Sequence, residues 1–382
     1  MQLTYHPKKQ SHNHKLDVVV NILKNNVVLC IATLLAIITS IFVPPDIKYL
    51  DYFDFKTLTC LFCVLAVVNA LKGIKFFTLL ATKIVKVFKT TRSAILALVY
   101  VTFIGSMLIA NDMALLTFLP LGYFVLTSTG KTRLMAFTFI MQNIAANLGG
   151  MLTPFGNPQN LYLYTCFNIG NLEFIKTMLL PFIISVTLIT ICCLFVKKEP
   201  LTIEENQTKL PTFKTIIYLL LFALSIIIVF RFLHYLIGLI VIVGVLLFMD
   251  KSALKKVDYG LLLTFVMFFI FAGNTSRIPF ISNVLSSLMN ANPLLVPVIS
   301  CQVISNVPSA ILLSRFTTNW QALLIGVNIG GVGTLISSLA SLITFKEYTK
   351  HNPDKTLKYV GLFSIFNFAF LIILTTVCLF LI

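Results

Sequence analysis

Charged side chains are scarce in this sequence, and acidic side chains are the scarcest. Only 11% of its 382 residues are charged and only 13 are Asp or Glu, whereas 58% are hydrophobic. A soluble domain needs a water-facing surface that such a composition does not supply. The sequence therefore excludes a soluble globular protein and predicts an all-α polytopic membrane protein.

The apolar stretches also lack the residue patterns that catalysis would need. They contain no His/Glu metal spacing, no paired carboxylates and no nucleophile beside a base, so we expect no enzyme and no cofactor beyond a coupling ion. The eight cysteines lie almost entirely in apolar sequence. For pairs such as Cys60/Cys63, small apolar packing is a simpler interpretation than redox or zinc chemistry. Residues 1–25 lack the apolar core of a cleaved signal peptide, and we expect a cytoplasmic tail there.

Long apolar stretches are what the sequence has in abundance. A bilayer core takes about 20 apolar residues per helix. The stretches that meet or approach this length are 26–45, 54–72, 93–128, 132–165, 174–197, 214–231, 234–249, 257–274, 294–318, 319–346 and 357–382. Two of them, 93–128 and 294–318, resemble paired legs around a polar turn, which favours re-entrant hairpins, with pairs of full spans as the alternative. Two others, 132–165 and 319–346, are too long for one straight helix. We therefore expect about nine full spans, two of them broken, and two hairpins.

The net charge of +16 follows membrane topology and does not indicate a nucleic-acid partner. Of the 29 Lys and Arg, 23 fall in segments on one side of the predicted membrane: 1–25, 72–92, 131–133, 197–214, 251–256 and 346–358. Such an excess marks the cytoplasmic side. We expect a multi-pass protein of the bacterial plasma (inner) membrane with a cytoplasmic N-terminus and no nucleic-acid partner.

Three stretches of the first half recur in the second half in the same order. The aligned stretches are 53–77 with 257–281, 109–118 with 304–313, and 147–153 with 328–334. They place Asn111 on Asn306 and Asn147 on Asn328. With the lysine-rich segments on the cytoplasmic side, corresponding helices of the two repeats cross the membrane in opposite directions. The repeats are therefore predicted to be inverted. Inverted repeats are typical of secondary transporters, which bind substrate at the repeat interface.

Polar residues, glycine and proline interrupt the apolar sequence at four places. These are residues 111–112 and 305–308, each between two apolar legs, and residues 147–160 and 328–334, each inside a long segment. Backbone opened at such points can coordinate cations through carbonyl groups and anions through helix N-termini. Close helix packing explains the glycine pairs equally well. It does not explain the Asn, Thr and Gln residues beside them.

Asp112 is the one acidic residue deep within apolar sequence, because the other twelve lie in tails, loops or helix ends. A carboxylate inside a membrane is costly and usually marks an ion or proton path. Asp112 is therefore predicted to bind a cation with Asn111 or to carry a proton. An aspartate at an interfacial turn is the alternative.

These motifs resemble the ion transporter superfamily, and within it the citrate-transporter and divalent anion:sodium symporter-like permeases. The resemblance covers roughly residues 50–382. It implies a homodimeric scaffold and a transport domain that moves as an elevator, with two sodium sites flanking an anionic substrate. The implied organisation is a cytoplasmic tail (1–25), scaffold helices with an amphipathic interfacial arm (26–92), a transport domain (93–197), a cytoplasmic linker (198–213), and the second scaffold-and-arm (214–293) and transport (294–382) parts.

Carried onto this sequence, the resemblance assigns each site residue by number. The first cation site would be Asn111, Asn147 and Gly150, and the second would be Asn306, Asn328 and Gly331. The substrate would contact Ser305, Val307, Thr153, Pro154 and Thr334. From the residues themselves we expect Asn111, Asp112 and Asn306 at the same substrate site. This sequence departs from the pattern at the first tip, which has a carboxylate and no hydroxyl groups, so proton coupling and a cationic or neutral substrate stay open.

The predicted function is secondary active transport of a small, anionic solute, either a carboxylate or an inorganic oxyanion. A sodium or proton gradient would drive it by an elevator-type mechanism. The expected partners are the solute, Na⁺ or H⁺, the lipid bilayer and a second copy of the chain. A cation/proton antiporter, an arsenite-type oxyanion exporter and a passive channel are the alternatives.

Overall fold

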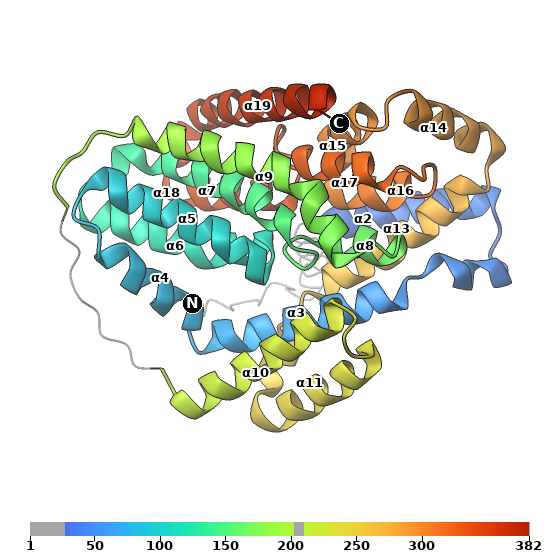
Figure 1. Cartoon of the computed structure of the whole chain (residues 1–382), viewed down its shortest axis with the longest axis horizontal. Helices are drawn as coiled ribbons and strands as arrows, with labels where there is room; N and C mark the ends of the chain where they lie inside the picture. The colour runs from blue at the N-terminus through green and yellow to red at the C-terminus, as the bar shows by residue number, and fades with distance from the viewer. Residues whose placement is uncertain (1–26, 202–209, 382) are drawn as a thin grey trace, which may run out of the picture.

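The computed structural model describes residues 27–201 and 210–381 (Figure 1). The predicted tail at 1–25 and residues 202–209 of the predicted linker lie outside the described residues. Within the described ranges the regular structure is helical, and one isolated bridge joins Thr90 to Pro200. The prediction of an all-α polytopic membrane protein is confirmed, since six helices are long and apolar enough to cross a membrane.

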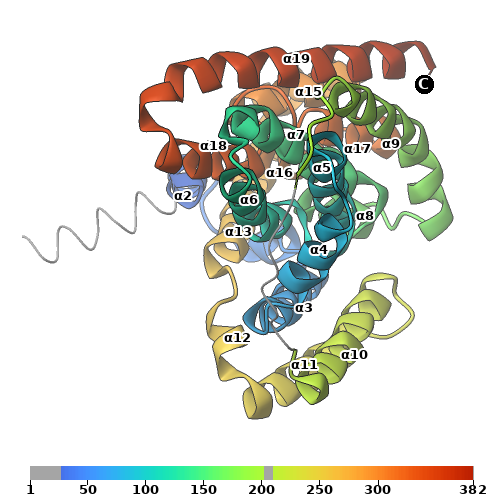
Figure 2. The same cartoon turned by 90° about the vertical axis from the view of Figure 1, so that its left-hand side faces the viewer.

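One group of helices contains the segments predicted as scaffold. It comprises α2 (Val27–Phe42), α3 (Phe55–Gly73), α10 (Thr212–Val229), α11 (Tyr235–Met249), α12 (Lys251–Lys255) and α13 (Tyr259–Ser276). Helix α2 packs along α13, and α3 packs against α10 and α11. Both views show α3, α10 and α11 together at the lower side of the molecule (Figures 1 and 2).

The aligned aspartates of the two repeats have the same structural role in this group. Asp54 and Asp258 are the N-caps of α3 and α13, and each accepts a hydrogen bond at 2.9 Å from a backbone N–H three residues later. A carboxylate at this position satisfies a free N–H and suits the helix dipole. The repeat detected in the sequence therefore corresponds to a shared local structure. Its inverted orientation stays a prediction.

The second group contains the segments predicted as transport domain. Its helices are α5 (Thr91–Ile109), α6 (Asn111–Ser128), α7 (Met135–Gly149), α8 (Pro158–Cys166), α9 (Asn171–Leu194), α15 (Leu295–Ile304), α16 (Asn306–Leu313), α17 (Trp320–Ile329), α18 (Leu339–His351) and α19 (Thr356–Leu381). Helices α5, α6 and α7 pack on one another, and α18 lies against α6 and α7. The halves of the sequence therefore interdigitate in this group (Figure 1).

A shorter helix follows the first aligned helix of each repeat, after α3 in the first half and after α13 in the second. These helices are α4 (Phe76–Lys86) and α14 (Pro279–Ala291), and α14 leaves Phe280, Val284 and Leu288 exposed. An apolar helix face without a protein partner suits a membrane interface. The amphipathic arms predicted within 26–92 and 214–293 thus contain the helices α4 and α14, and their place in the membrane interface stays a prediction.

Each hairpin turns at a single residue, whereas the sequence placed the turns at residues 111–112 and 305–308; in the structure residues 111–112 already belong to α6. Ala110 joins α5 to α6 with φ 65°, and Ser305 joins α15 to α16 with φ 74°. This region of φ is rare for residues with a Cβ atom. Helices α15 and α16 have 10 and 8 residues, or about 15 and 12 Å, which is too short for a bilayer core about 30 Å thick. Helices α5 and α6, with 19 and 18 residues, are long enough for either arrangement.

Both long apolar segments open where the sequence predicted a break. After α7 the chain forms a short 3₁₀ turn, Gly150–Leu152, and becomes helical again only at Pro158. After α17 it stays non-helical until α18 begins at Leu339. Proline and glycine favour such openings because they remove a donor or permit unusual dihedral angles.

Candidate functional site

Four buried asparagines meet where the hairpin tips touch the broken helices. Asn111 and Asn306 begin α6 and α16, while Asn147 and Asn328 lie in the last turns of α7 and α17, and each is at most 3% exposed. Asn111 Nδ2 donates to Asn147 Oδ1 at 3.3 Å. A methyl group built on Gly331 would lie 3.1 Å from Asn306 Nδ2 and 3.6 Å from Asn147 Oδ1. Elements of both halves therefore converge on one point.

Helix α8 supplies three further amides that were not assigned a role from the sequence. Asn157 Nδ2 donates to Asn328 Oδ1 at 3.2 Å, and Asn328 Nδ2 donates to Asn160 Oδ1 at 2.6 Å. Gln159 Nε2 reaches the same Asn328 oxygen at 3.5 Å. The oxygens Asn157 Oδ1 and Gln159 Oε1 are buried and have no hydrogen-bond partner within the described part of the chain. Unpaired buried oxygens are available to a cation or to water.

The two tips hold their asparagines in the same way. Asn111 Oδ1 accepts from the N–H of Asp112, and Asn306 Oδ1 accepts from the N–H of Val307, both at 2.9 Å. These bonds fix each side-chain oxygen over the N-terminus of its helix. A carbonyl oxygen has two lone pairs, so each can still bind a ligand.

The two threonines predicted to face the substrate form hydrogen bonds that join each break to the neighbouring hairpin. Thr153 donates its hydroxyl to the carbonyl of Met107 at 2.7 Å, and Thr334 donates to the carbonyl of Gln302 at 3.0 Å. Both acceptors lie four residues before the asparagine of their tip. The two repeats therefore share this hydrogen bond as well as the aligned residues. A threonine oxygen that donates in this way can still accept from a ligand.

The other predicted substrate residues also lie at the tips and breaks. Ser305 donates its hydroxyl to the carbonyl of Ser337 at 3.3 Å, in the loop before α18. Val307 is half-buried in the first turn of α16, and Pro154 is buried inside the first break. Their contact with a solute stays a prediction.

The glycine pairs serve both purposes considered from the sequence. A methyl group on Gly149 would lie 2.3 Å from the carbonyl oxygen of Phe103, and one on Gly330 would lie 2.8 Å from Cys301 Sγ. These first glycines let a hairpin leg pack closely. The second glycines, such as Gly150, face the amides of the site instead.

A buried polar network continues from the site along α7. Asn147 Nδ2 donates to the carbonyl of Asn143 at 3.1 Å, and Asn143 Nδ2 contacts Ser341 Oγ at 3.3 Å and Asn367 Oδ1 at 3.4 Å. Asn143, Ser341 and Asn367 are fully buried. Asn143 and Asn147 are four residues apart on one helix face, and this spacing is the sequence signal that could have revealed the network.

Asp112 breaks the symmetry between the tips. It lies in the first turn of α6, and its Oδ1 atom is buried with no hydrogen-bond partner among the described residues. The corresponding residue of the second tip is Val307. A helix N-terminus stabilises a carboxylate but does not replace a counter-ion. The arrangement can therefore accept a cation or a proton.

Comparison with known proteins agrees with this architecture. The family model described as Citrate transporter (CitMHS) matches residues 18–322. An uncharacterized transporter of Methanocaldococcus jannaschii is 36% identical over 261 residues, which are 68% of this chain and 72% of that protein. The inner membrane protein YbiR of Escherichia coli is 32% identical over 268 residues, covering 67% and 70% of the two chains.

A shorter match involves the putative transporter arsB of Dictyostelium discoideum, which is 29% identical over 124 residues, or 32% of this chain and 22% of that protein. The family match spans well over half of the sequence and includes the first hairpin, the first break and the second tip. The chain therefore belongs to the citrate transporter family and is a multi-pass membrane transport protein, not an enzyme.

Proposed function

We propose that the chain is a secondary active transporter that couples a sodium or proton gradient to the movement of a small anionic solute, a carboxylate or an inorganic oxyanion. The observation that supports this most is the convergence of both tips and both broken helices on one buried amide cluster. Inverted-repeat transporters place their binding sites at such breaks near the middle of the bilayer. We place the protein in the bacterial plasma membrane, with a cytoplasmic N-terminus.

Helix N-termini support an anionic solute. Helices α6 and α16 begin at the tips, and α8 and α18 begin after the breaks. Helix α16 packs on α8, and α6 packs on α18. The N-terminus of a helix carries a partial positive charge and free N–H groups, so four of them around one site favour an anion.

Because of the negative charge on Asp112, a cation must bind before the anionic solute can bind. Two unit negative charges about 5 Å apart repel by about 3 kcal/mol at an effective dielectric constant of about 20. A cation on the Asp112 carboxylate removes this repulsion and allows the anion to bind. The unpaired oxygens of Asn157 and Gln159 supply further neutral ligands of the kind that a hard cation prefers.

The elevator-type movement would separate the two groups of helices, and two arginines join them here. Arg231, after α10, donates to Asn168 Oδ1 at 2.6 Å and to the carbonyl of Tyr164 at 2.5 Å, with its guanidinium 4.1 Å from the centre of the Tyr164 ring. Arg315, after α16, donates to the carbonyl of Tyr52 at 3.0 Å. These contacts stabilise the present arrangement and must break if the groups slide. A homodimer of the scaffold groups belongs to the same proposal.

Arg231→Gln is expected to loosen the end of α8. Losing the two hydrogen bonds at a partly exposed site removes about 1 kcal/mol, so the amides near Tyr164–Asn168 should exchange hydrogen about fivefold faster. Hydrogen–deuterium exchange of the purified protein measures this. Arg277→Gln is the matched control, because Arg277 pairs with Asp46 inside the scaffold group at 2.7 Å. Unchanged exchange at α8 in the Arg231 variant would contradict the proposed tie.

The proposed function is tested first by binding and then by flux. Purified protein is screened by thermal shift against citrate, other carboxylates and inorganic oxyanions, in sodium and in choline and at two pH values. We expect one class of anion to stabilise the protein only when the coupling cation is present. That anion should then accumulate in proteoliposomes when the cation gradient is imposed. Uptake at equal rates without any gradient would indicate a passive channel.

Antiport or oxyanion export is the second candidate, and the unpaired carboxylate of Asp112 favours it. The partial similarity to the protein named arsB points the same way. Under this alternative, inverted vesicles would show cation-dependent proton movement by dye quenching with no organic solute present. Proton movement that appears only with a carboxylate would support symport instead.

A further inference from the structure

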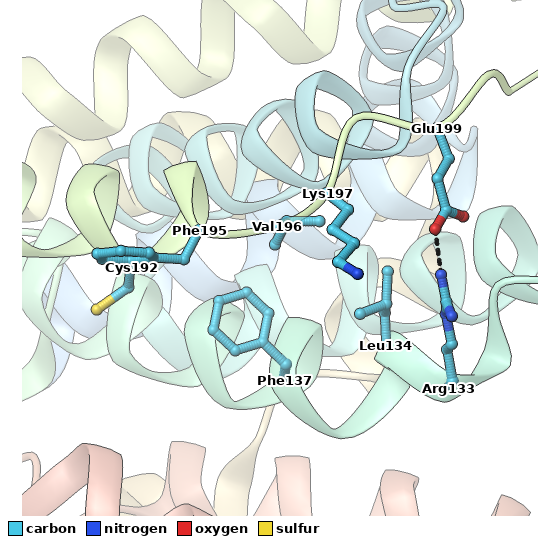
Figure 3. Close-up of a pocket in the computed structure, with 8 residues that line it drawn as sticks. All are labelled: Arg133, Leu134, Phe137, Cys192, Phe195, Val196, Lys197 and Glu199. Carbon is cyan, nitrogen blue, oxygen red and sulfur yellow. Dashed lines mark hydrogen bonds and ion pairs between the residues drawn. The ribbon is translucent and has the colours of Figure 1, made fainter.

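An open cavity lies far from the asparagine site. It has a volume of about 450 Å³ and is formed by the start of α7, the end of α9 and the chain that follows α9 (Figure 3). Its lining residues are Arg133, Leu134, Phe137, Cys192, Phe195, Val196, Lys197 and Glu199. Arg133 and Asn147 are 14 residues apart, close to opposite ends of α7, so about 20 Å separates the cavity from the candidate transport site.

Basic side chains dominate the mouth of this cavity. The acidic residue in the lining is Glu199. Its carboxylate pairs with Lys131 Nζ at 2.5 Å and with the guanidinium of Arg133. The hydrogen bond from Lys131 and the neighbouring Arg133 lower the pKa of Glu199, so its carboxylate stays ionised and occupied. Lys197 and Lys198 are exposed and make no ion pair within the described ranges. Among the described residues that line the cavity, Arg133 and Lys197 are basic and Glu199 is acidic, so Lys197 is left without an acidic partner.

The other side of the cavity is apolar and continues along α9. In Figure 3 the side chain of Lys197 extends toward the space between Phe137 and Leu134. Phe195 lies on the other side of Val196 and is 83% exposed. From this point a row of exposed apolar side chains follows one face of α9, at Leu194, Ile191, Ile183, Leu179, Ile175 and Leu172. Their spacing of mostly three or four residues marks a single stripe toward lipid.

We propose that this cavity binds the headgroup of an anionic phospholipid whose acyl chains lie along the stripe of α9. The phosphate would meet Lys197 and the free donors of Arg133, and the glycerol region would rest on Phe137 and Phe195. Basic pockets between transmembrane helices on the cytoplasmic side suit anionic headgroups. A soluble anion would contact the cavity alone, whereas a phospholipid would contact the cavity with its headgroup and the adjoining stripe with its acyl chains.

The position of this site gives the lipid a structural role. Arg92 at the start of α5 donates its Nε to the carbonyl of Val196 at 2.6 Å, so the wall of the cavity also joins α5 to α9. A bound lipid would contact the chain that holds the ends of α5, α7 and α9 together. We therefore expect the lipid to stabilise this helix group.

The test compares lipids and variants on the delipidated full-length protein in a zwitterionic detergent. Phosphatidylglycerol should raise the thermal midpoint, whereas phosphatidylcholine and inorganic phosphate at the same concentration should not. In Lys197→Gln/Arg133→Gln, half-maximal stabilisation should need about 25-fold more phosphatidylglycerol, because each cation near an anionic lipid contributes about fivefold in affinity. Lys346→Gln/Lys350→Gln, which removes two exposed cations of α18, is the matched control and should respond as the wild type does.

Each outcome decides the proposal. An equal shift with phosphatidylcholine, an equal shift with phosphate alone, or an unchanged response in the double variant overturns it. If the double variant proves unstable without lipid, Lys197→Gln alone is used, and native mass spectrometry counts the phosphatidylglycerol that remains bound. Equal lipid retention by that variant and the wild type also overturns the proposal.

Discussion

Asp112→Asn should make the protein more stable in the absence of its coupling cation and should abolish the stabilisation that the cation provides. The wild-type carboxylate has a buried oxygen with no hydrogen-bond partner among the described residues. Asp112 is partly buried, so an unpaired charge there costs less than one in a fully buried position, and the neutral amide has almost the same shape. We expect a gain of about 1–3 kcal/mol without cation. Cation-driven uptake should fall at least about tenfold, because a hydrogen-bonded charge contributes about 1.5–3 kcal/mol.

Asp46→Asn is the matched control for this prediction. Asp46 pairs with Arg277 at 2.7 Å, and the Arg277 hydrogen bond lowers the pKa of Asp46. Asp46→Asn should therefore leave the stability of the protein unchanged or lower it slightly. The stabilisation by the coupling cation should remain in this variant. Thermal unfolding of both variants in sodium and in choline measures the contrast. If Asp112→Asn and Asp46→Asn behave alike, Asp112 is not the coupling carboxylate.

The sequence predicted the backbone of the site better than its side-chain pairs. Glycine and proline act locally, so the opening after Gly149 and the new helix at Pro158 could be inferred from the residues themselves. The repeat then located Asn306 and Asn328 from Asn111 and Asn147. The turns were predicted less well, because Ala110 and Ser305 adopt positive φ without being glycine. Only contacts with the rest of the fold select such a conformation.

Partners that are distant in sequence explain what the prediction missed. Asn160 meets Asn328 across 168 residues, and Asn143 meets Asn367 across 224 residues. Such pairs depend on the register of packed helices, which no local pattern contains. The lipid cavity was missed for a similar reason. Lys131, Arg133 and Lys197 were interpreted only as markers of the cytoplasmic side. The structure shows that Lys131 and Arg133 pair with Glu199 and that Lys197 lines the same cavity.

These results suggest a division of roles within the central site. The tip asparagines and the opened helices are common to both halves, so they form a symmetrical frame that both halves can present to a small ligand. Asp112, Asn157 and Gln159 occur in the first half only, and each carries a buried oxygen with no hydrogen-bond partner among the described residues. We therefore expect cation selectivity to depend on the first half, whereas substitutions at Asn306 should weaken the affinity for the anion.

Gly150→Ala should disable the site even though it adds only one methyl group. That methyl would lie 2.4 Å from Asn157 Oδ1 and 2.7 Å from the carbonyl of Gly156, closer than any tolerated contact. Asn157 also bonds Asn328, so it cannot retreat without breaking the link between the two broken helices. Overpacking of this kind costs about 1–3 kcal/mol, and we expect cation-dependent stabilisation to be lost as well.

Gly244→Ala separates this steric effect from the general effect of replacing a glycine. Gly244 lies in α11, and a methyl group there would meet nothing within 4 Å. A helical glycine replaced by alanine under such conditions gains about 0.5–1 kcal/mol. Thermal unfolding should therefore shift in opposite directions in the two variants. If Gly150→Ala retains both its stability and its response to cation, the backbone at the first break moves more freely than these contacts allow, and the first cation site must lie elsewhere.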